Sequence, residues 1–187
     1  MAETTPMNNG RVLLTVDGPV AVLTLNDPAV YNAFGVKLKQ DITQALDGVD
    51  AARARCLVIT GAGNAFCSGA NLNDKDRVPR DRMAEVRGEV KSDLELWYHP
   101  TFQRLRGMEI PIITAINGIA AGAGMSLALS GDIKIAARSA SFLQAFARIG
   151  LVPDAGSSYI LPRLIGQARA VELSLLAERL PAETAFQ

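Results

Sequence analysis

A run of small residues between two apolar segments constrains this chain more than any other feature. Residues 117–124 read Asn-Gly-Ile-Ala-Ala-Gly-Ala-Gly; they follow the apolar residues 110–116 and precede the apolar residues 127–129. This order predicts a strand, a glycine turn and the start of a helix. Such a turn lets backbone N–H groups approach a ligand closely, and the N-terminus of a helix favours negative charge there.

A second segment has the same order of apolar residues and glycines. The apolar residues 56–60 precede residues 61–72, which read Gly-Ala-Gly-Asn-Ala-Phe-Cys-Ser-Gly-Ala-Asn-Leu. One such loop alone is explained more simply as a turn that requires glycine. Two strand-to-glycine loops can aim two amides at one oxygen atom, which is the arrangement of an oxyanion hole.

Composition narrows the range of proteins to which the chain can belong. Its 187 residues are 49% hydrophobic, so it can bury a substantial core, and we expect one domain over residues 1–187. The formal net charge is zero, with both signs interspersed, which argues against a nucleic-acid partner. The two cysteines, Cys56 and Cys67, indicate free thiols in a reducing compartment. Cys67 has no basic neighbour to activate a thiolate, so we expect it to be a packing residue.

One long segment without charge raises the question of a membrane span. No charged residue occurs between Glu109 and Asp132. Pro111, Asn117 and several glycines interrupt this segment, which favours a buried strand and a buried helix over a membrane-spanning helix. The first ten residues are polar and carry no hydrophobic core of a signal peptide. We therefore expect a cytoplasmic protein without membrane association.

Hydrophobic patterns along the chain predict alternating strands and helices. The predicted strands are residues 11–16, 20–25, 56–60, 112–116 and 133–136. The predicted helices are residues 35–49, 83–105, 123–129, 154–164 and 167–177, and the charged residues 73–82 are predicted to form a loop. Asp17-Gly18 supplies the turn of a β-hairpin between the first two strands. Strands that alternate with helices indicate an α/β fold with mostly parallel pairing.

The two glycine loops, in this order and at this separation, resemble those of the crotonase (enoyl-CoA hydratase/isomerase) superfamily. The similar segments run from residues 20–28 and Asn32-Ala33 to residues 150–156 and 161–166, which is nearly the whole chain. The resemblance implies repeated ββα units wound into a spiral, an acyl-CoA thioester as substrate, and assembly into homotrimers or hexamers. It also implies no metal or redox cofactor, since coenzyme A is part of the substrate.

Members of the superfamily commonly continue with further C-terminal helices. This chain stops at Gln187, within a predicted helix that starts near Pro181. We therefore expect that the C-terminal helical region is truncated in this chain.

The resemblance assigns the oxyanion hole to the N–H groups of Ala70 and Ala123. Two amides that hold a thioester oxygen make the carbonyl a better electron acceptor, because they bind an enolate oxygen more strongly than a neutral carbonyl. The family pattern also implies that residues around the first loop bind coenzyme A, mostly through backbone groups. These coenzyme A-binding residues are Ala33, Ala65, Phe66, Ser68, Asn71, Leu72 and Asn73.

Hydratases of the superfamily use two glutamates, and this chain has neither. The matching positions are Ser126 and Phe146, which cannot act as a general acid or base at neutral pH. Efficient hydration by the usual mechanism is therefore not expected. The nearest carboxylate is Asp154, in the segment Val-Pro-Asp-Ala-Gly.

Asp154 has two interpretations. Taken alone, it is the N-cap of a helix that begins at Ala155, which is a common role for aspartate. The same position carries the single catalytic aspartate of ring-opening, dienoyl-CoA and enoyl-CoA isomerases, and residues 136–142 and 150–154 are most similar to the bacterial phenylacetate-pathway isomerases. By this resemblance Asp154 shuttles a proton in an enoyl-CoA isomerase of fatty acid metabolism or phenylacetate catabolism.

Aromatic residues supply the predicted acyl pocket. Phe142 and Phe146, together with Leu151, would bury the Asp154 carboxyl and raise its pKa. His99 lies close to the position of a histidine in aryl-CoA dehalogenases, in which the aspartate is a nucleophile. Phe146 replaces the tryptophan of those enzymes, so dehalogenation and weak hydration stand second to isomerisation. A non-catalytic acyl-CoA-binding protein is the remaining alternative.

Overall fold

The computed structural model of the protein describes residues 2–77 and 81–187, and this part of the chain contains two sheets. The larger sheet has six strands in the order β1-β2-β3-β4-β6-β8. They are β1 (Glu3–Pro6), β2 (Val12–Asp17), β3 (Val20–Leu25), β4 (Cys56–Gly61), β6 (Ile112–Ile116) and β8 (Ile133–Ala136). The pairs β1–β2 and β2–β3 are antiparallel, whereas β3, β4, β6 and β8 run parallel. The predicted hairpin is confirmed, because Asp17 pairs with Val20 across its turn.

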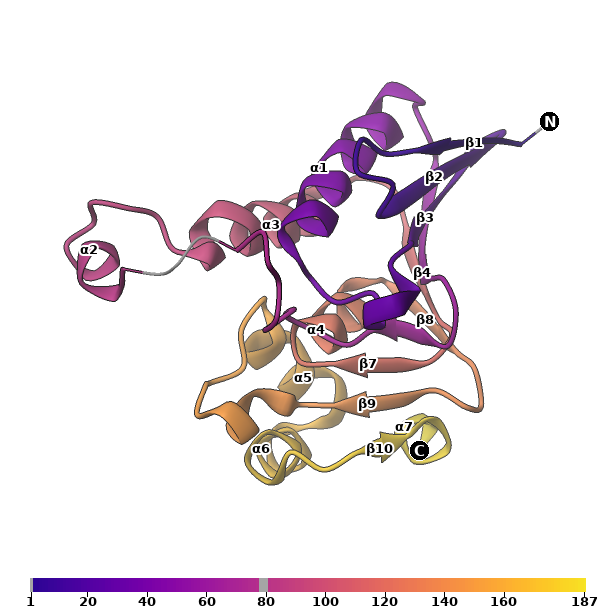
Figure 1. Ribbon diagram of the computed structural model, residues 1–187. Coiled ribbons are helices and arrows are strands. Elements are labelled where there is room, and N and C mark those ends of the chain that lie inside the picture. Colours follow the sequence, from indigo (N-terminus) through magenta and orange to yellow (C-terminus); the bar gives the residue numbers. More distant parts are fainter. Residues whose placement is uncertain (1, 78–80) are drawn as a thin grey trace.

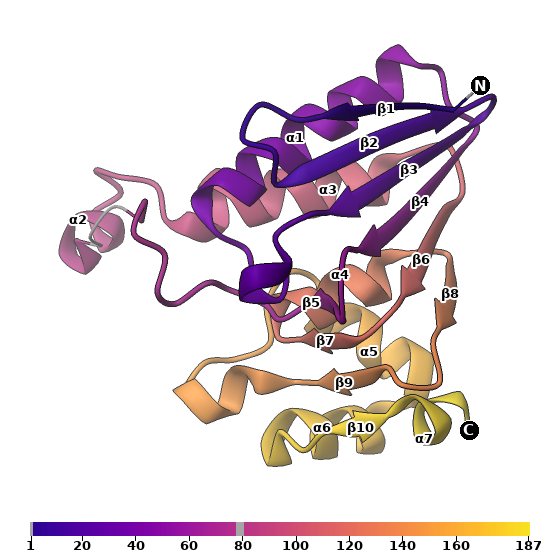
Figure 2. The ribbon, with the colours of Figure 1, turned by 45° about the vertical axis from the view of Figure 1, so that its right-hand side comes forward.

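A smaller sheet of four strands, in the order β10-β9-β7-β5, continues the fold below the larger one (Figure 2). Its strands are β5 (Ala65–Cys67), β7 (Ile119–Ala121), β9 (Ser141–Leu143) and β10 (Leu180–Pro181). Along the chain, β4 is followed by β5, β6 by β7, and β8 by β9, and helical segments follow each pair. The predicted α/β fold of repeated ββα units is therefore confirmed.

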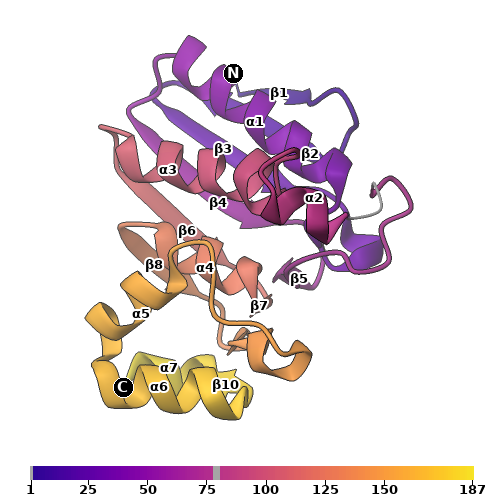
Figure 3. The same ribbon diagram turned by 90° about the vertical axis from the view of Figure 1, so that its left-hand side faces the viewer.

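Helices cover the sheets and fill the space between them. α1 (Val36–Ala51) and α3 (His99–Gly107) lie side by side on one face of the larger sheet (Figures 1 and 3). α4 (Ala123–Ser130) packs against β6 and β7, one strand of each sheet, and its residues 123–129 are buried. The other helices are α2 (Arg82–Val86), α5 (Ser157–Ile165), α6 (Gln167–Leu176) and α7 (Ala182–Phe186). Short segments are 3₁₀-helical at η1 (Pro28–Val30) and η3 (Ala145–Ile149) and π-helical at η2 (Leu94–Tyr98).

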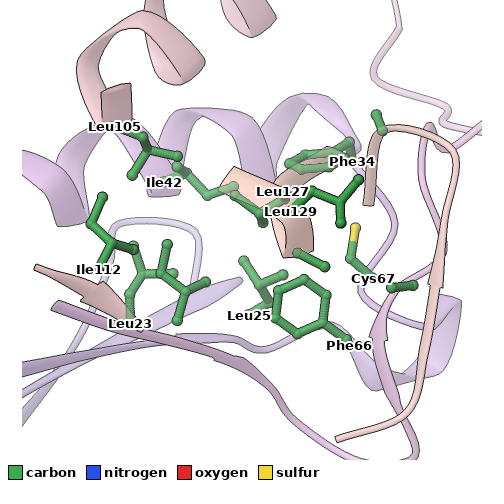
Figure 4. Close-up of a cluster of buried hydrophobic side chains, with 14 of the residues drawn as sticks. Leu23, Leu25, Phe34, Ile42, Phe66, Cys67, Leu105, Ile112, Leu127 and Leu129 are labelled. Atoms are coloured by element: carbon green, nitrogen blue, oxygen red, sulfur yellow. The ribbon is translucent and has the colours of Figure 1, made fainter. Parts of the chain in front are cut away.

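Side chains from the larger sheet and its covering helices form the hydrophobic core (Figure 4). The alternating pattern of β3 buries Leu23 and Leu25, while the helical spacing of α1 buries Ile42 and Leu46. Leu127 of α4 joins the same cluster. Full burial of one such side chain stabilises the fold by about 1.5–3 kcal/mol. This core holds α4 in place at the end of the second glycine loop.

The long helix predicted over residues 83–105 is wrong. The chain there forms α2, a turn at Gly88 with φ of +71°, then η2 and α3. Gly88 explains the break, because a left-handed glycine commonly ends a helix. Pro100 is favoured only in the first turn of a helix, which is where α3 has it. The predicted loop 73–82 falls partly on residues 78–80, which lie outside the described residues.

The charge-free segment divides as expected into a strand and a helix. Residues 110–131 contain β6, the short β7 and the buried α4. Within the described ranges, we find no helix long and apolar enough to cross a bilayer.

Candidate active site

The two glycine loops lie side by side at the carboxyl ends of two parallel strands of the smaller sheet. β5 ends at Cys67 and β7 ends at Ala121, and these strands are parallel neighbours. β9 lies on the other side of β7, and the chain that follows β9 leads through η3 to Asp154 (Figure 2). The carboxyl ends of parallel strands are a common place for ligand binding in α/β folds.

Glycines allow the two loops to approach each other closely. A Cβ placed on Gly69 would lie 2.7 Å from the carbonyl oxygen of Ala121, and one placed on Gly124 would collide with the carbonyl of Cys67. Gly69 also has φ of +93°, a conformation that side chains rarely permit. Gly69 therefore requires glycine for both space and conformation, and Gly124 requires it for space.

The amides of Ala70 and Ala123 have no hydrogen-bond acceptor in the part of the chain that the structure describes. Ala123 is the first residue of α4, where N–H groups lack intrahelical partners. Near Ala70, the N–H of Phe34 donates to the Gly69 carbonyl at 2.7 Å. Because the C=O and N–H of one trans peptide point in opposite directions, the N–H of Ala70 points away from Phe34. Two free amides at adjoining loops are the donors that an oxyanion hole requires.

Gly122 makes the sharp turn from β7 into α4. It is the N-cap of α4, with φ of +51° and ψ of −127°, and its own N–H donates to the Leu143 carbonyl of β9 at 2.9 Å. The turn brings the first amides of α4 to the sheet edge. The partial positive charge at this helix end favours an anionic oxygen there.

The carboxyl group of Asp154 does not cap a helix. α5 begins at Ser157, its N-cap is Gly156, and no side chain caps it. Asp154 Oδ1 is buried and has no hydrogen-bond partner among the described residues. Burial raises the pKa of the Asp154 carboxyl above its ordinary value, and the charge of His99 and the Asp154 backbone N–H offset part of the rise. The capping interpretation of this residue is therefore wrong.

Backbone contacts hold Asp154 beside the second glycine loop. Its carbonyl oxygen accepts the Ser126 hydroxyl at 3.1 Å and the Ser157 N–H at 2.9 Å. The Ser157 hydroxyl in turn accepts the Gln144 side-chain amide at 2.5 Å. Ser126 thus ties α4 to the Asp154 segment. Ala155 follows with φ of +50°, an uncommon conformation for a residue with a side chain.

The predicted acyl-pocket residues do not all lie as expected. Phe142 belongs to the core cluster, and Phe146 is buried in η3. His99 is exposed at the start of α3, yet its charge influences Asp154. Leu151 is 54% exposed, so the expectation that it buries Asp154 is wrong. It lies in the irregular segment between η3 and α5, where its N–H donates to the Phe146 carbonyl at 3.0 Å.

The predicted coenzyme A-binding residues fall into two groups, of which the first has buried side chains. Ala33, Ala65 and Phe66 are buried, so only their backbone groups could meet a ligand. The Ala65 carbonyl already accepts the side-chain amides of Asn32 at 2.8 Å and Asn117 at 3.2 Å. Phe66 is fully buried in the core (Figure 4). These three residues shape the loop.

The second group lies at the surface. Leu72 and Asn73 are exposed, and Ser68 and Asn71 are partly exposed. The Ser68 hydroxyl donates to the Val30 carbonyl at 3.3 Å, and Asn71 Oδ1 accepts the Asn73 N–H at 3.1 Å. Of the seven predicted residues, these four have exposed or partly exposed side chains.

Cys67 is an inert packing residue, as the sequence predicted. It is fully buried in β5, and burial raises the pKa of its thiol to about 12. A surface hollow of about 490 Å³ lies between β1, β2 and α1, but none of the candidate site residues lines it.

The predicted site set omitted a buried polar cluster beside the first loop. Lys39 of α1 is 6% exposed and pairs with Asp93 at 2.5 Å. Its Nζ lies 5.4 Å from the ring centroid of Tyr98, which is itself buried. The signal in the sequence was a lysine on the apolar face of a predicted helix, where lysine is rarely buried without a partner.

Comparison with known proteins gives consistent matches. Residues 15–187 match the family model described as enoyl-CoA hydratase/isomerase. The chain is 43% identical over 177 residues to the 1,2-epoxyphenylacetyl-CoA isomerase of Escherichia coli (strain K12), covering 94% of this chain and 66% of that protein. It is 34% identical to the trans-2-decenoyl-[acyl-carrier-protein] isomerase of Streptococcus mutans, covering 97% of this chain and 68% of that protein.

Solved structures agree with these matches. The enoyl-CoA hydratase of Bacillus anthracis superposes with a TM-score of 0.80 at 30% identity, covering 94% of this chain and 66% of that one. The chain thus spans just under two thirds of the Escherichia coli isomerase and of this hydratase.

Proposed function

The chain belongs to the enoyl-CoA hydratase/isomerase family, and from that premise we propose that it is an acyl-CoA isomerase that moves a double bond through a thioester enolate. The single observation that carries the proposal is Asp154, whose carboxyl atom Oδ1 is buried without a hydrogen-bond partner among the described residues, whose pKa is raised, and whose backbone is bound to α4 through Ser126. A carboxylate that is not needed for a structural hydrogen bond or ion pair is available for proton transfer.

The amides of Ala70 and Ala123 activate the thioester in this proposal. They donate to the carbonyl oxygen, and they bind it more strongly once it carries the charge of an enolate. In other enzymes, one such donor contributes about 3 kcal/mol to transition-state stabilisation. The acidity of the carbon next to the carbonyl rises accordingly.

Asp154 moves the proton. Its carboxylate takes a proton from C2 or C4 of the unsaturated acyl group, and the electron pair passes into the conjugated enolate. The same proton then returns from the neutral carboxyl to the other end of the conjugated system, so the double bond shifts and the enzyme is unchanged. A raised pKa makes the carboxylate a better proton acceptor.

Hydration fits this site less well. Ser126 and Phe146 occupy the positions of the two hydratase glutamates, and neither side chain activates water at neutral pH. The Ser126 hydroxyl is buried and already donates to the Asp154 carbonyl.

The substrate class and assembly are also proposals. The likeness to an isomerase of 1,2-epoxyphenylacetyl-CoA supports an unsaturated or ring-derived acyl-CoA. Assembly into homotrimers or hexamers is supported by apolar side chains that this chain leaves exposed in β8, α6 and α7. They are Ile133, Ile135, Leu175, Leu176 and Phe186.

The experiment follows conversion of a 3-enoyl-CoA to the conjugated 2-enoyl-CoA by thioester absorbance, in the wild type and in Asp154→Asn. We expect turnover in the wild type and its near loss in the variant, with binding of the CoA ester retained. Substantial activity in Asp154→Asn would reject the assigned proton shuttle. Binding without turnover in the wild type would favour the non-catalytic alternative.

Dehalogenation is a second candidate because the charge of His99 reaches Asp154. In that reaction Asp154 would attack a halogenated aryl ring, and halide would leave. Release of chloride from a 4-chlorobenzoyl-CoA probe would favour it over isomerisation.

A further inference from the structure

A tyrosine hydroxyl lies buried near Asp154 without a hydrogen-bond partner. Tyr98 is 5% exposed and is the last residue of the π-helical segment η2. Neither its hydroxyl oxygen nor Asp154 Oδ1 has a partner among the described residues. Most buried polar atoms in proteins are hydrogen-bonded, because an unpaired one is costly. Two such atoms in one region therefore need an explanation.

The ring of Tyr98 packs against Phe34, a residue bound to the first glycine loop. It makes an edge contact with Phe34, with ring centroids 5.5 Å apart and planes at 64°. Phe34 is the residue whose N–H binds the Gly69 carbonyl, next to the free amide of Ala70. On another side, the ammonium of Lys39 lies 5.4 Å from the ring centroid. These contacts fix the position of the hydroxyl.

Groups from both parts of the candidate site influence the pKa of the Tyr98 hydroxyl. Burial raises the pKa of Tyr98, and the charges of Asp93, Cys67 and Asp154 raise it further. Cys67 ends β5 within the first glycine loop, while Asp154 supplies the unpartnered Oδ1. The phenol keeps its proton at neutral pH and is therefore a hydrogen-bond donor.

We propose that the Tyr98 hydroxyl donates a hydrogen bond to an oxygen atom on the acyl group, and that the site thereby selects oxygen-substituted acyl-CoA esters over hydrocarbon ones. The inference rests on the proposed function in one respect, that an acyl-CoA occupies the site. A hydrocarbon acyl group leaves the hydroxyl unpaired, whereas an oxygen at this place pairs it. Sites with such a buried polar group discriminate strongly against the ligand that lacks the matching atom.

The test compares two unreactive esters that differ by one oxygen atom, 2-hydroxyphenylacetyl-CoA and phenylacetyl-CoA. Calorimetry gives the affinity of each for the wild type and for Tyr98→Phe. We expect the wild type to bind the hydroxylated ester about tenfold more tightly, which corresponds to one good hydrogen bond. Tyr98→Phe should bind both esters equally. A wild type without the preference, or a variant that keeps it, would overturn the proposal.

Stability without ligand separates this role from a structural one. Tyr98→Phe removes only an unpaired hydroxyl, so its melting temperature should equal or exceed that of the wild type. A lower melting temperature would mean that the hydroxyl has a partner within the protein and would count against the proposal.

Tyr159→Phe is the matched control. Tyr159 is 50% exposed and its ring packs against Arg163, away from the buried cluster. This variant should keep the preference for the hydroxylated ester. Because the readout is binding, absence of turnover in the wild type would contradict the proposed function alone, and absence of the preference would contradict the role of Tyr98 alone.

Discussion

The two glycine loops and the Asp154 segment are built in different ways. The loops are defined by backbone: Gly69 and Gly124 have no room for a side chain, and the donors are main-chain amides. The Asp154 segment is partly exposed, and a hydroxyl from Ser126 helps to hold it. The comparison teaches that, in the proposed mechanism, the part that would activate the thioester depends on close packing. The part that would move a proton depends on the identity of a few side chains.

The largest effect is expected where packing is tightest. Gly124→Ala places a Cβ against the Cys67 carbonyl, and backbone cannot yield as a flexible side chain can. We expect a loss of about 3 kcal/mol or more in the free energy of unfolding, measured by urea denaturation.

Gly107→Ala is the control for that variant. Gly107 ends α3 with nothing within 4 Å of the added Cβ, so the change should be neutral or stabilising by up to about 1 kcal/mol. Equal stability of the two variants would show that the loops tolerate an added side chain. The claim that the glycine loops depend on close packing would then be rejected.

Asp154→Asn should affect turnover and stability in opposite directions. Loss of the proton shuttle should lower kcat by about 10²–10⁴-fold. The folded-state pKa lies above the unfolded one, so ionisation of Asp154 opposes folding as pH rises through the folded pKa. At neutral pH the variant should therefore be at least as stable as the wild type, and the difference should shrink below the ordinary pKa of aspartate. Destabilisation at neutral pH, followed by denaturant unfolding, would instead indicate a structural role.

The pH dependence of the rate should report the same carboxyl. Because the base must be ionised, kcat/KM should rise with pH through an apparent pKa above the ordinary aspartate value. His99 lowers this pKa through its charge, so His99→Gln should move the rising limb to higher pH. If the rising limb of the pH profile does not move, the charge of His99 does not act on Asp154.

The smallest effect is expected at Ser126. Ser126→Ala removes the hydrogen bond to the Asp154 carbonyl, and we expect kcat to fall by up to about tenfold, since one such bond is worth about 1 kcal/mol. Ser130→Ala is the matched control on the same helix, because the Ser130 hydroxyl donates to the Leu127 carbonyl within α4, at 2.7 Å. A similar loss in both variants would point to α4 as a whole.

The glycines allowed the two glycine loops to be predicted from the sequence. A glycine between apolar segments marks a turn or a close approach, and Gly69 and Gly124 are both such positions. The predicted helix at residues 123–129 is confirmed as α4, and the predicted strands beside it are confirmed as β6 and β8. The strands β5, β7 and β9 were missed because three residues are too few to show a period.

The conformation of the Asp154 segment could not be predicted from the sequence in the same way. Asp154 precedes the small residues Ala155 and Gly156 and fits a helix start by pattern alone. Its true conformation depends on contacts with Ser126 and Ser157, which only the folded chain brings together. The unpaired hydroxyl of Tyr98 is likewise a tertiary property, since a tyrosine in a helical pattern carries no mark of its missing partner.

The order of the short parallel strands has a consequence for how new reactions arise on this fold. Ala70, Ala123 and Asp154 follow β5, β7 and β9, so each lies in a different repeat of the chain. In the proposed mechanism, a mutation within the third repeat can therefore replace the group that moves the proton, while the first two repeats still supply both amides. A change of reaction then requires substitutions in one repeat only.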